Sequence, residues 1–295
     1  MVSETSIDGG PAHVELATTQ RVARVSALIA NVLGLPAPAE SDQFLAQRLT
    51  RFAASNGWAA LDAFIETGNT ERLRSLVGVQ HSWFWRDPEQ FTFLIERVTQ
   101  QLQDGRPLRF WTAAASAGQE PYSLAMAVLQ ATQPRAPCVR ILATDLDAAA
   151  LDLGRNGVYG AAAVANLPQS MRQWLTELPL AIGGSNWQVR PEVTELVEFR
   201  AHDLLSLSWC DEADLLCGDD GQFDAIFCRN VLIYFAAPYR YAVLEGLAKR
   251  LAPGGLLCLG PGETVGSARH LFEPCGRGMY MRRSPKRPAH EDTTT

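Results

Sequence analysis

The chain has 295 residues, of which 47% are hydrophobic and 20% charged, the composition of an ordinary globular protein with a sizeable core. Its net charge of −6 argues against a general affinity for nucleic acid or for anionic membrane surfaces. The six cysteines form no Cys-x-x-Cys pair and the five histidines are dispersed, so neither a disulfide framework nor a metal site is predicted.

Nothing in the sequence resembles a targeting or membrane segment. The N-terminus lacks the basic start and the apolar stretch of a signal peptide. No apolar run approaches the roughly 20 residues that a membrane-spanning helix needs. We therefore expect a cytoplasmic protein.

The first part of the chain is predicted to be helical. Residues 1–18 and 284–295 are polar and aperiodic, so both are expected to be disordered tails. Between residues 19 and 80, apolar side chains recur at three- and four-residue spacing, which predicts a small all-α domain. Its helices include segments near Ala59–Glu66 and Glu71–Val77.

Residues 81–106 are predicted to form a linker and a first helix. Asp87 followed by Pro88 is typical of a helix start, with Asp as the N-cap and Pro at the first helical position. The aromatic run 83–85 just before it is expected to belong to the core rather than to a base-stacking platform.

From residue 107 to residue 283 the pattern is that of an α/β domain. Short apolar runs alternate with amphipathic helical segments, which predicts a parallel sheet covered on both faces by helices. The runs are Leu108–Thr112, Val139–Thr144, Glu198–Ala201, Phe223–Cys228 and Leu256–Gly260.

One interval between predicted strands is unusually long. Over forty residues separate the helix near Ala148–Arg155 from the strand at Glu198, and within them Gly183-Gly184 stands beside the strand-like Trp187–Val189. This predicts a small β-insertion at about 160–200 that contains a hairpin.

The segment after the first predicted strand, Ala113–Glu120, occupies the place of a nucleotide-binding loop. In a doubly wound sheet, ligands bind beyond the carboxyl ends of the strands. The segment has neither Gly-x-Gly-x-x-Gly nor the lysine of a P-loop, and it closes with Glu120, a carboxylate that would repel a phosphate. A ligand with a cationic amine or sulfonium and no phosphate fits it better.

The second predicted strand ends in Asp145. A carboxylate at that place suits the two hydroxyls of a ribose, although an Asp after a strand is as often a simple helix cap. An adenosine-type ribose, a positive charge and no phosphate together describe S-adenosylmethionine.

Four segments carry a family likeness: AAASAGQEPYS, ILATDLD, FDAIFCRNVLIYF and LAPGGLLCLGPGET, in this order. With HSWFWRDPEQF upstream, they resemble the chemotaxis-receptor glutamate methyltransferases, the CheR family, over roughly residues 20–283. The resemblance implies a Rossmann-like S-adenosylmethionine-dependent methyltransferase domain with a small β-subdomain insertion, preceded by a small all-α N-terminal domain. It also implies methyl transfer to glutamate side chains of chemoreceptors, with S-adenosylhomocysteine as the product and no metal.

The resemblance implies particular site residues. Arg86 and Tyr234 would lie beside the reacting groups, where Arg86 could orient either the incoming carboxylate or the carboxylate of the cofactor. Tyr234 could donate a hydrogen bond to one acceptor oxygen. The cofactor contacts would be Gln80, Ser82, Arg86, Glu120, Asp145, Asp203, Leu204, Asn230 and Val231.

Purely structural roles compete with these assignments. Arg86 could pair on the surface with Asp87 or Glu89, and Tyr234 could be ordinary packing at a strand end. Asn230 is different, because an amide at the end of an apolar strand needs buried hydrogen-bond partners, which an adenosyl ligand would supply.

The sequence departs from the family pattern at a few positions, which leaves the substrate more open than the cofactor. They are Gln80, His81 and Ser82 for a usual Asn-x-Thr, Gln119 for a common acid, Asp203 for a usual Asn, and Pro261-Gly262 for a typical His-Ser.

The implied partners are chemoreceptor cytoplasmic helices. Docking would use Arg48 and Arg51, three residues apart on one predicted helix face, and the β-insertion; those arginines could equally be a solvated surface. Neither nucleic acid nor membrane insertion is expected. The alternatives are the same cofactor with another protein or a small carboxylate as acceptor, or a non-catalytic cofactor-binding sensor.

Overall fold

The computed structural model describes residues 19–25, 27–28, 49, 53, 57–67, 82–181, 183–205, 222–235 and 237–284. The chain divides into two compact units. The first comprises Met1–Val79 with Ile233–Tyr239, and the second comprises Gln80–Leu232 with Arg240–Thr295. Within the described residues, no helix combines the length and the apolar character that crossing a membrane requires.

In the first unit, the described residues before residue 68 are almost all helical. Residues 19–25 are helical, and α3 spans Trp58–Thr67, which confirms the helix predicted near Ala59–Glu66. Arg21 donates to both carboxylate oxygens of Asp62 at 2.6 Å, so this ion pair joins two helical segments that are 41 residues apart. The predicted helix Glu71–Val77 and the two predicted tails lie outside the described residues, except for Ser284.

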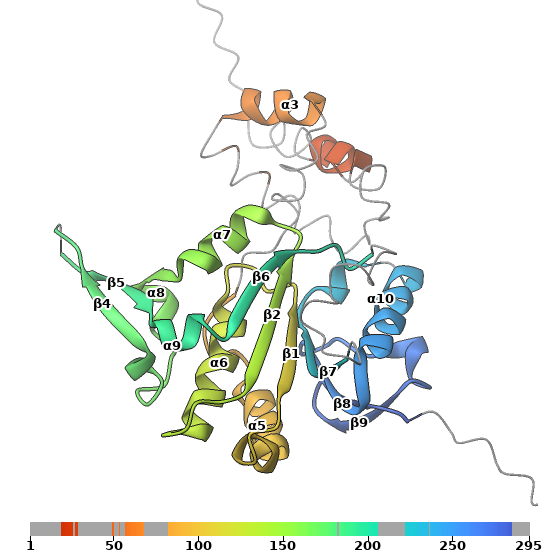
Figure 1. Ribbon diagram of the computed structural model, residues 1–295. Coiled ribbons are helices and arrows are strands. Elements are labelled where there is room, and N and C mark those ends of the chain that lie inside the picture. The colour runs from red at the N-terminus through yellow and green to blue at the C-terminus, as the bar shows by residue number, and fades with distance from the viewer. Residues whose placement is uncertain are drawn as a thin grey trace, which may run out of the picture. The chain divides into compact units, whose positions relative to one another are not determined.

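The second unit is built on a seven-stranded sheet with the order β6-β2-β1-β7-β8-β10-β9 (Figure 1). The pairs from β6 to β8 are parallel, whereas β10 runs antiparallel to both β8 and β9. The strands are β1 Leu108–Ala113, β2 Val139–Asp145, β6 Val197–Ala201, β7 Phe223–Cys228, β8 Leu251–Leu259, β9 Phe272–Gly276 and β10 Met279–Arg282.

Helices cover this sheet along its length. Figure 1 shows α6 and α7 on the part that carries β2 and β6, with α10 beside β7 and β8. The helices are α5 Pro88–Gln103, α6 Gln119–Thr132, α7 Ala148–Asn156, α8 Ala161–Val164, α9 Pro191–Thr194 and α10 Ala237–Arg250, with the 3-10 turns η1 Arg172–Trp174, η3 Leu232–Tyr234 and η4 Gly266–Ala268. The predicted α/β class is confirmed.

The last strands differ from the prediction. β8 starts at Leu251, five residues before the predicted strand at Leu256, and the antiparallel pair β9 and β10 was not predicted. Pro253-Gly254-Gly255 reads as a turn in the sequence, but the register between β7 and β8 shifts there, so Phe223 pairs with Leu251 and Ala225 with Leu256. A bulge therefore carries the turn-like residues inside one strand.

A second, three-stranded antiparallel sheet forms the predicted β-insertion (Figure 1). β5 (Ser185–Val189) lies between β3 (Val158–Gly160) and β4 (Leu175–Pro179). Gly183 and Gly184, with φ of 87° and 84°, close the hairpin between β4 and β5, where their left-handed conformation favours glycine. The hairpin is as predicted, and β3 begins two residues before the predicted edge at 160.

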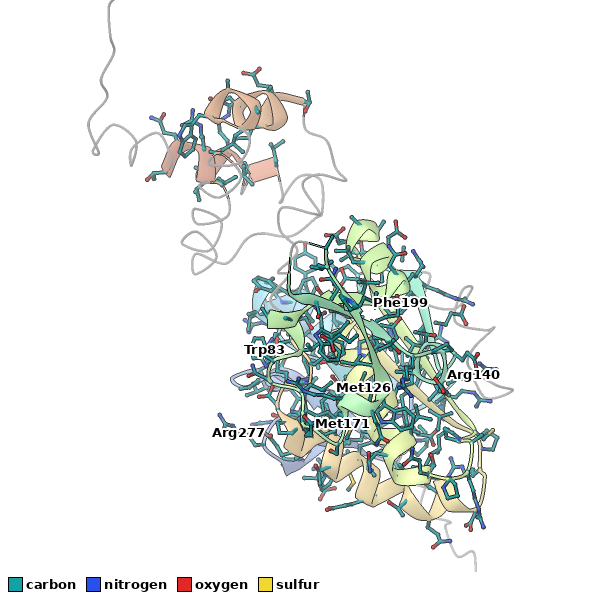
Figure 2. The ribbon with its side chains drawn as sticks, turned by 90° about the vertical axis from the view of Figure 1, so that its left-hand side faces the viewer. Trp83, Met126, Arg140, Met171, Phe199 and Arg277 are labelled. Carbon is teal, nitrogen blue, oxygen red and sulfur yellow. The ribbon has the colours of Figure 1, made fainter. Side chains whose placement is uncertain are left out.

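The core of the second unit is formed by the sheet together with residues of α5, α6 and the β-insertion. Met126 on α6 is fully buried, and Phe199 on β6 packs so close to Gly154 of α7 that a Cβ there would lie 2.6 Å from the ring. Figure 2 shows Phe199 and Met126 within the body of this unit and Arg140 at its edge. This packing sets the distance between α7 and β6, and through it the position of the loop above β1.

Candidate cofactor and active site

The loop between β1 and α6 is a tight turn of small residues. Ala114, Ser116 and Gly118 all have left-handed backbones, with φ of 69°, 51° and 90°. The amide of Ala115 donates to the carbonyl of Thr144 at 2.8 Å, which ties the loop to the end of β2. Two non-glycine residues in this strained region are typical of a site that the surrounding structure holds in place.

Gly118 is needed there for space as well as for conformation. A Cβ would lie 3.0 Å from both the ring of Phe199 and the hydroxyl of Tyr159, and 3.1 Å from Gly154. The Tyr159 hydroxyl also donates to the carbonyl of Ala117 at 2.6 Å. The single glycine of the loop is therefore explained by packing of the protein on itself, not by the approach of a pyrophosphate.

Asp145 points its carboxylate at this loop. Its Oδ2 accepts from the amide of Ser116 at 2.7 Å, and its Oδ1 accepts from the amide of Asp147 at 2.9 Å. The capping of α7 falls to Asp147, which accepts from the amides of Ala149 and Ala150. The helix-cap reading of Asp145 is therefore wrong: its carboxylate accepts hydrogen bonds from the backbone amides of Ser116, Leu146 and Asp147.

The Asp145 carboxyl is shielded from water. Burial raises its pKa above the ordinary value, and the hydrogen bonds from the amides of Asp147 and Ser116 oppose this effect. A carboxylate held in this way gains from any further hydrogen-bond donor or positive charge.

Glu120 lies in the first turn of α6 with 13% of its side chain exposed, and it pairs with a buried cation. The Arg229 guanidinium, 1% exposed, donates through Nη1 to Glu120 Oε2 at 3.0 Å. Burial raises the pKa of Glu120, and the charges of Arg229 and Arg86 oppose this effect. Arg229 is absent from the predicted site residues. The sequence feature that could have indicated Arg229 is a single arginine at the end of an apolar strand.

Arg86 lies in a short linker segment whose backbone is also left-handed, at Trp85 (φ 62°) and Asp87 (φ 51°). Its guanidinium stacks over the ring of Trp83 at 4.2 Å, and its Nε lies 3.9 Å from Asp87 Oδ2. Trp83 is 41% exposed, so only Phe84 of the aromatic run is fully buried as predicted.

The predicted helix start at Asp87-Pro88 is confirmed, with Asp87 as the N-cap residue and Pro88 as the first residue of α5. The Asp87 carboxylate, however, makes no capping hydrogen bond. The carboxylate instead pairs with Nη2 of Arg229, which also donates to the carbonyl of Arg86 at 2.9 Å. The predicted surface pairing of Arg86 with Asp87 is thus a contact at 3.9 Å to a carboxylate that a buried arginine already holds.

Asn230 lies two residues beyond the end of β7, and it is held by a second residue absent from the predicted set. Glu263 Oε2 accepts from the amides of both Asn230 and Gly260 at 2.7 Å, which clamps the end of β7 to the end of β8. Asn230 has a left-handed backbone, with φ of 57°. Sequence reasoning missed Glu263 because its role depends on contacts between two strand ends.

The Gly260→Ala substitution is expected to destabilise the folded protein by about 1–3 kcal/mol, because overpacking forces the neighbouring atoms apart. A Cβ at Gly260 would lie 2.6 Å from the side-chain Nδ2 of Asn230, 2.7 Å from Glu263 Oε2 and 2.8 Å from the backbone nitrogen of Asn230. The matched control is Gly160→Ala, where the nearest atom is Asn186 Oδ1 at 3.9 Å. Thermal and urea unfolding measure both. Equal midpoints for the two variants would contradict the tight clamp.

The remaining predicted residues are placed as follows. Asp203 accepts from the amide of Leu205 at 2.9 Å, just beyond β6, and Leu204 is 7% exposed. Ser82 and Val231 are half-buried. Tyr234 ends η3, half-buried, and is grouped with the first unit. Gln80, His81, Arg48 and Arg51 lie outside the described residues.

The strand ends bring the central residues to one edge of the sheet. Ala113 of β1 pairs with Thr144 of β2 and with Cys228 of β7, and Cys228 pairs with Leu259 of β8. The residues just beyond these pairs include Asp145, Asn230 and the loop that ends in Glu120. This is the edge at which ligands bind in doubly wound sheets.

The charges at this edge favour a cation. Four carboxylates (Asp87, Glu120, Asp145 and Glu263) accompany two guanidinium groups (Arg86 and Arg229), and no lysine of the described part of the chain takes part. No group of His, Cys, Asp and Glu within the described ranges is arranged to hold a metal ion. The site residues fit a ligand that carries hydroxyl donors and positive charge, and they do not form a phosphate cradle.

Comparisons with known proteins agree on one family. The family description "CheR methyltransferase, SAM binding domain" matches residues 80–281. The chain is 36% identical over 215 residues to chemotaxis protein methyltransferase 2 of Pseudomonas aeruginosa, covering 73% of this chain and 74% of that protein. It is 35% identical over 259 residues to the chemotaxis protein methyltransferase of Vibrio anguillarum, covering 82% of this chain and 90% of that protein.

A third relative is named for a different role. The chain is 31% identical over 226 residues to the probable biofilm formation methyltransferase WspC of Pseudomonas aeruginosa. The match covers 75% of this chain and 51% of that longer protein.

Proposed function

The chain belongs to the CheR methyltransferase family, and from this premise we propose that it methylates glutamate side chains of chemoreceptors in the cytoplasm. The products are glutamyl methyl esters that serve chemosensory adaptation, and S-adenosylhomocysteine. The observation that carries the proposal is the strand-end site, in which Asp145 and Glu120 flank a loop without a phosphate cradle.

The residues would hold the cofactor by charge and hydrogen bonding. Asp145 places a carboxylate at the end of β2, where it suits the hydroxyls of a ribose. Glu120 accepts from Arg229 through Oε2, so Oε1 remains for a cationic amine. Asn230, Val231, Asp203 and Leu204 would line the adenosyl side, and Ser82 and Gln80 the linker side.

The acceptor needs little activation. A glutamate carboxyl has a reference pKa of about 4.3 and is ionised at neutral pH, so no strong general base is required. When bound, S-adenosylmethionine supplies a sulfonium methyl group that becomes the methyl of the ester. The protein contributes alignment, which is worth several kcal/mol in such reactions.

Arg86 and Tyr234 are the residues that we assign to this alignment. The Arg86 guanidinium, held against the ring of Trp83 at 4.2 Å, is a fixed cation that orients a carboxylate, either of the acceptor or of the cofactor. Tyr234, half-buried in η3, donates a hydrogen bond to one oxygen of the acceptor while the other is methylated.

Receptor helices are the proposed partners. Arg48, Arg51 and the three-stranded insertion are the surfaces through which they would dock. The likeness to a biofilm formation methyltransferase favours a second candidate, the same glutamate chemistry on the receptor of a sensory array outside motility.

The decisive experiment is a methylation assay. The full chain is incubated with methyl-labelled S-adenosylmethionine and cytoplasmic fragments of chemoreceptors, and we expect label that mild alkali releases as methanol. Label that survives alkali would exclude a glutamyl ester. Cofactor binding without transfer to any receptor would favour another carboxylate acceptor or a sensor without catalysis.

A further inference from the structure

Arg229 connects three parts of the site that are far apart in the sequence. Its Nη1 donates to Glu120 Oε2 on α6 at 3.0 Å. Its Nη2 pairs with the carboxylate of Asp87 and donates to the carbonyl of Arg86 at 2.9 Å. The guanidinium also lies 5.8 Å from the centre of the Phe91 ring. One buried cation thus binds the carbonyl of Arg86 and the side chain of Asp87, the two residues joined by one peptide bond.

The linker that it holds does not adopt a low-energy conformation by itself. Trp85 and Asp87 both have positive φ, which for a bulky side chain such as Trp is a genuine outlier. The amide of Trp85 donates to Ser123 Oγ at 2.9 Å, and that hydroxyl donates to the carbonyl of Gln119 at 2.6 Å. The strained segment is therefore fastened at Trp85 by α6 and at Asp87 by Arg229.

We propose that Arg229 is a positioning residue, which locks linker residues 85–87 in their left-handed conformation and so presents Arg86 and Glu120 to the site together. This inference deepens the proposed function and rests on it for the role of Arg86. Arg229 acts through its neighbours, because its two Nη atoms are engaged by Glu120, Asp87 and the Arg86 carbonyl and its side chain is only 1% exposed.

The same contacts explain why lysine would not replace it. A guanidinium presents several N–H groups in a planar fork and can serve two carboxylates and a carbonyl at once, whereas an ammonium is a single point charge. Arg229→Lys should therefore pair with one carboxylate and release the other.

The first test uses the cofactor-free full chain. Asp87→Asn keeps the size of the side chain and tolerates a left-handed backbone, but it removes the charge that Arg229 holds. We expect the backbone amides of residues 82–87 to exchange hydrogen about tenfold faster, with the rest of the second unit unchanged. The control is Asp152→Asn, which breaks the exposed pair with Arg155 and should leave residues 82–87 unaffected. Arg229→Lys should accelerate the same amides if it folds.

The second test is a double-mutant cycle with Arg86→Ala. We measure the affinity for S-adenosylhomocysteine by calorimetry, and we measure the methylation rate. The cycle is analysed with the quantity that Arg86→Ala lowers. Asp87→Asn should lower that quantity about tenfold in the wild-type background and less than twofold in the Arg86→Ala background, because a residue that acts through Arg86 loses its effect with Arg86.

The outcomes separate this inference from the proposed function. Equal effects of Asp87→Asn in both backgrounds, or unchanged exchange at residues 82–87, would overturn the positioning role. A wild-type protein that methylates no receptor would refute the proposed function, while the exchange and affinity measurements would still decide the role of Arg229.

Discussion

Asp145→Asn is expected to weaken S-adenosylmethionine binding about ten- to a hundredfold, the effect of losing charge-assisted hydrogen bonds worth about 1.5–3 kcal/mol. The carboxylate accepts from the Ser116 amide through Oδ2 and from the Asp147 amide through Oδ1, and it is the acceptor that we assign to the ribose hydroxyls. Asn retains one acceptor oxygen, so the loop keeps part of its support. Calorimetric titration with the cofactor measures the change.

Two comparisons make this result interpretable. Asp145→Ala also removes the acceptors of the Ser116 and Asp147 amides, so it should lower the unfolding free energy as well as the affinity. Asp152→Asn, on the exposed face of α7, should alter neither. An Asp145→Asn protein that binds the cofactor as tightly as the wild type would refute the ribose assignment.

The affinity should also depend on pH. Burial raises the pKa of both Asp145 and Glu120 in the cofactor-free protein. Because a ligand that brings hydroxyl donors and positive charge binds the ionised carboxylates, affinity should fall as the pH is lowered through these raised pKa values.

The raised pKa values affect the stability of the cofactor-free protein in the opposite direction. A folded-state pKa above the unfolded value means that the folded state binds more protons, so each buried carboxyl contributes less stability as the pH rises through that window. The cofactor should therefore raise the melting temperature more at about pH 7.5 than at about pH 5.

Arg86→Ala is expected to reduce the methylation rate about a hundredfold, since it removes a charged donor that aligns a carboxylate. The guanidinium is held against the Trp83 ring at 4.2 Å, and the backbone carbonyl of Arg86 accepts from Arg229. A loss in kcat with unchanged cofactor affinity would assign Arg86 to the acceptor, and a loss in affinity would assign it to the cofactor.

The matched control is Arg106→Ala, which removes an arginine that pairs with Asp224 at 2.8 Å, away from the strand-end site. It should leave the methylation rate within about twofold of the wild type, as expected for a half-exposed ion pair. A comparable loss of activity in both variants would point to a general effect on folding, and the alignment role of Arg86 would then fall.

The sequence by itself determined the fold class, the family and the kind of ligand. Alternation of apolar runs with amphipathic segments is a local pattern, and it predicted the parallel strands because burial on both faces demands it. The missing glycines and lysine after β1 excluded a phosphate ligand for an equally local reason. Gly183-Gly184 predicted the hairpin of the insertion, because a tight turn there requires positive φ.

Only the tertiary structure decided which charged groups act together. Asp87 and Asp145 both look like helix caps in the sequence, since each stands just before a helical segment. Asp87 is the N-cap residue of α5, but its carboxylate pairs with Arg229, 142 residues away, and the cap of α7 is Asp147. Arg229 and Glu263 were missed for the same physical reason. A buried charge is stable only beside its partner, and that partner is chosen by which strand ends meet at one edge of the sheet, which no local pattern records.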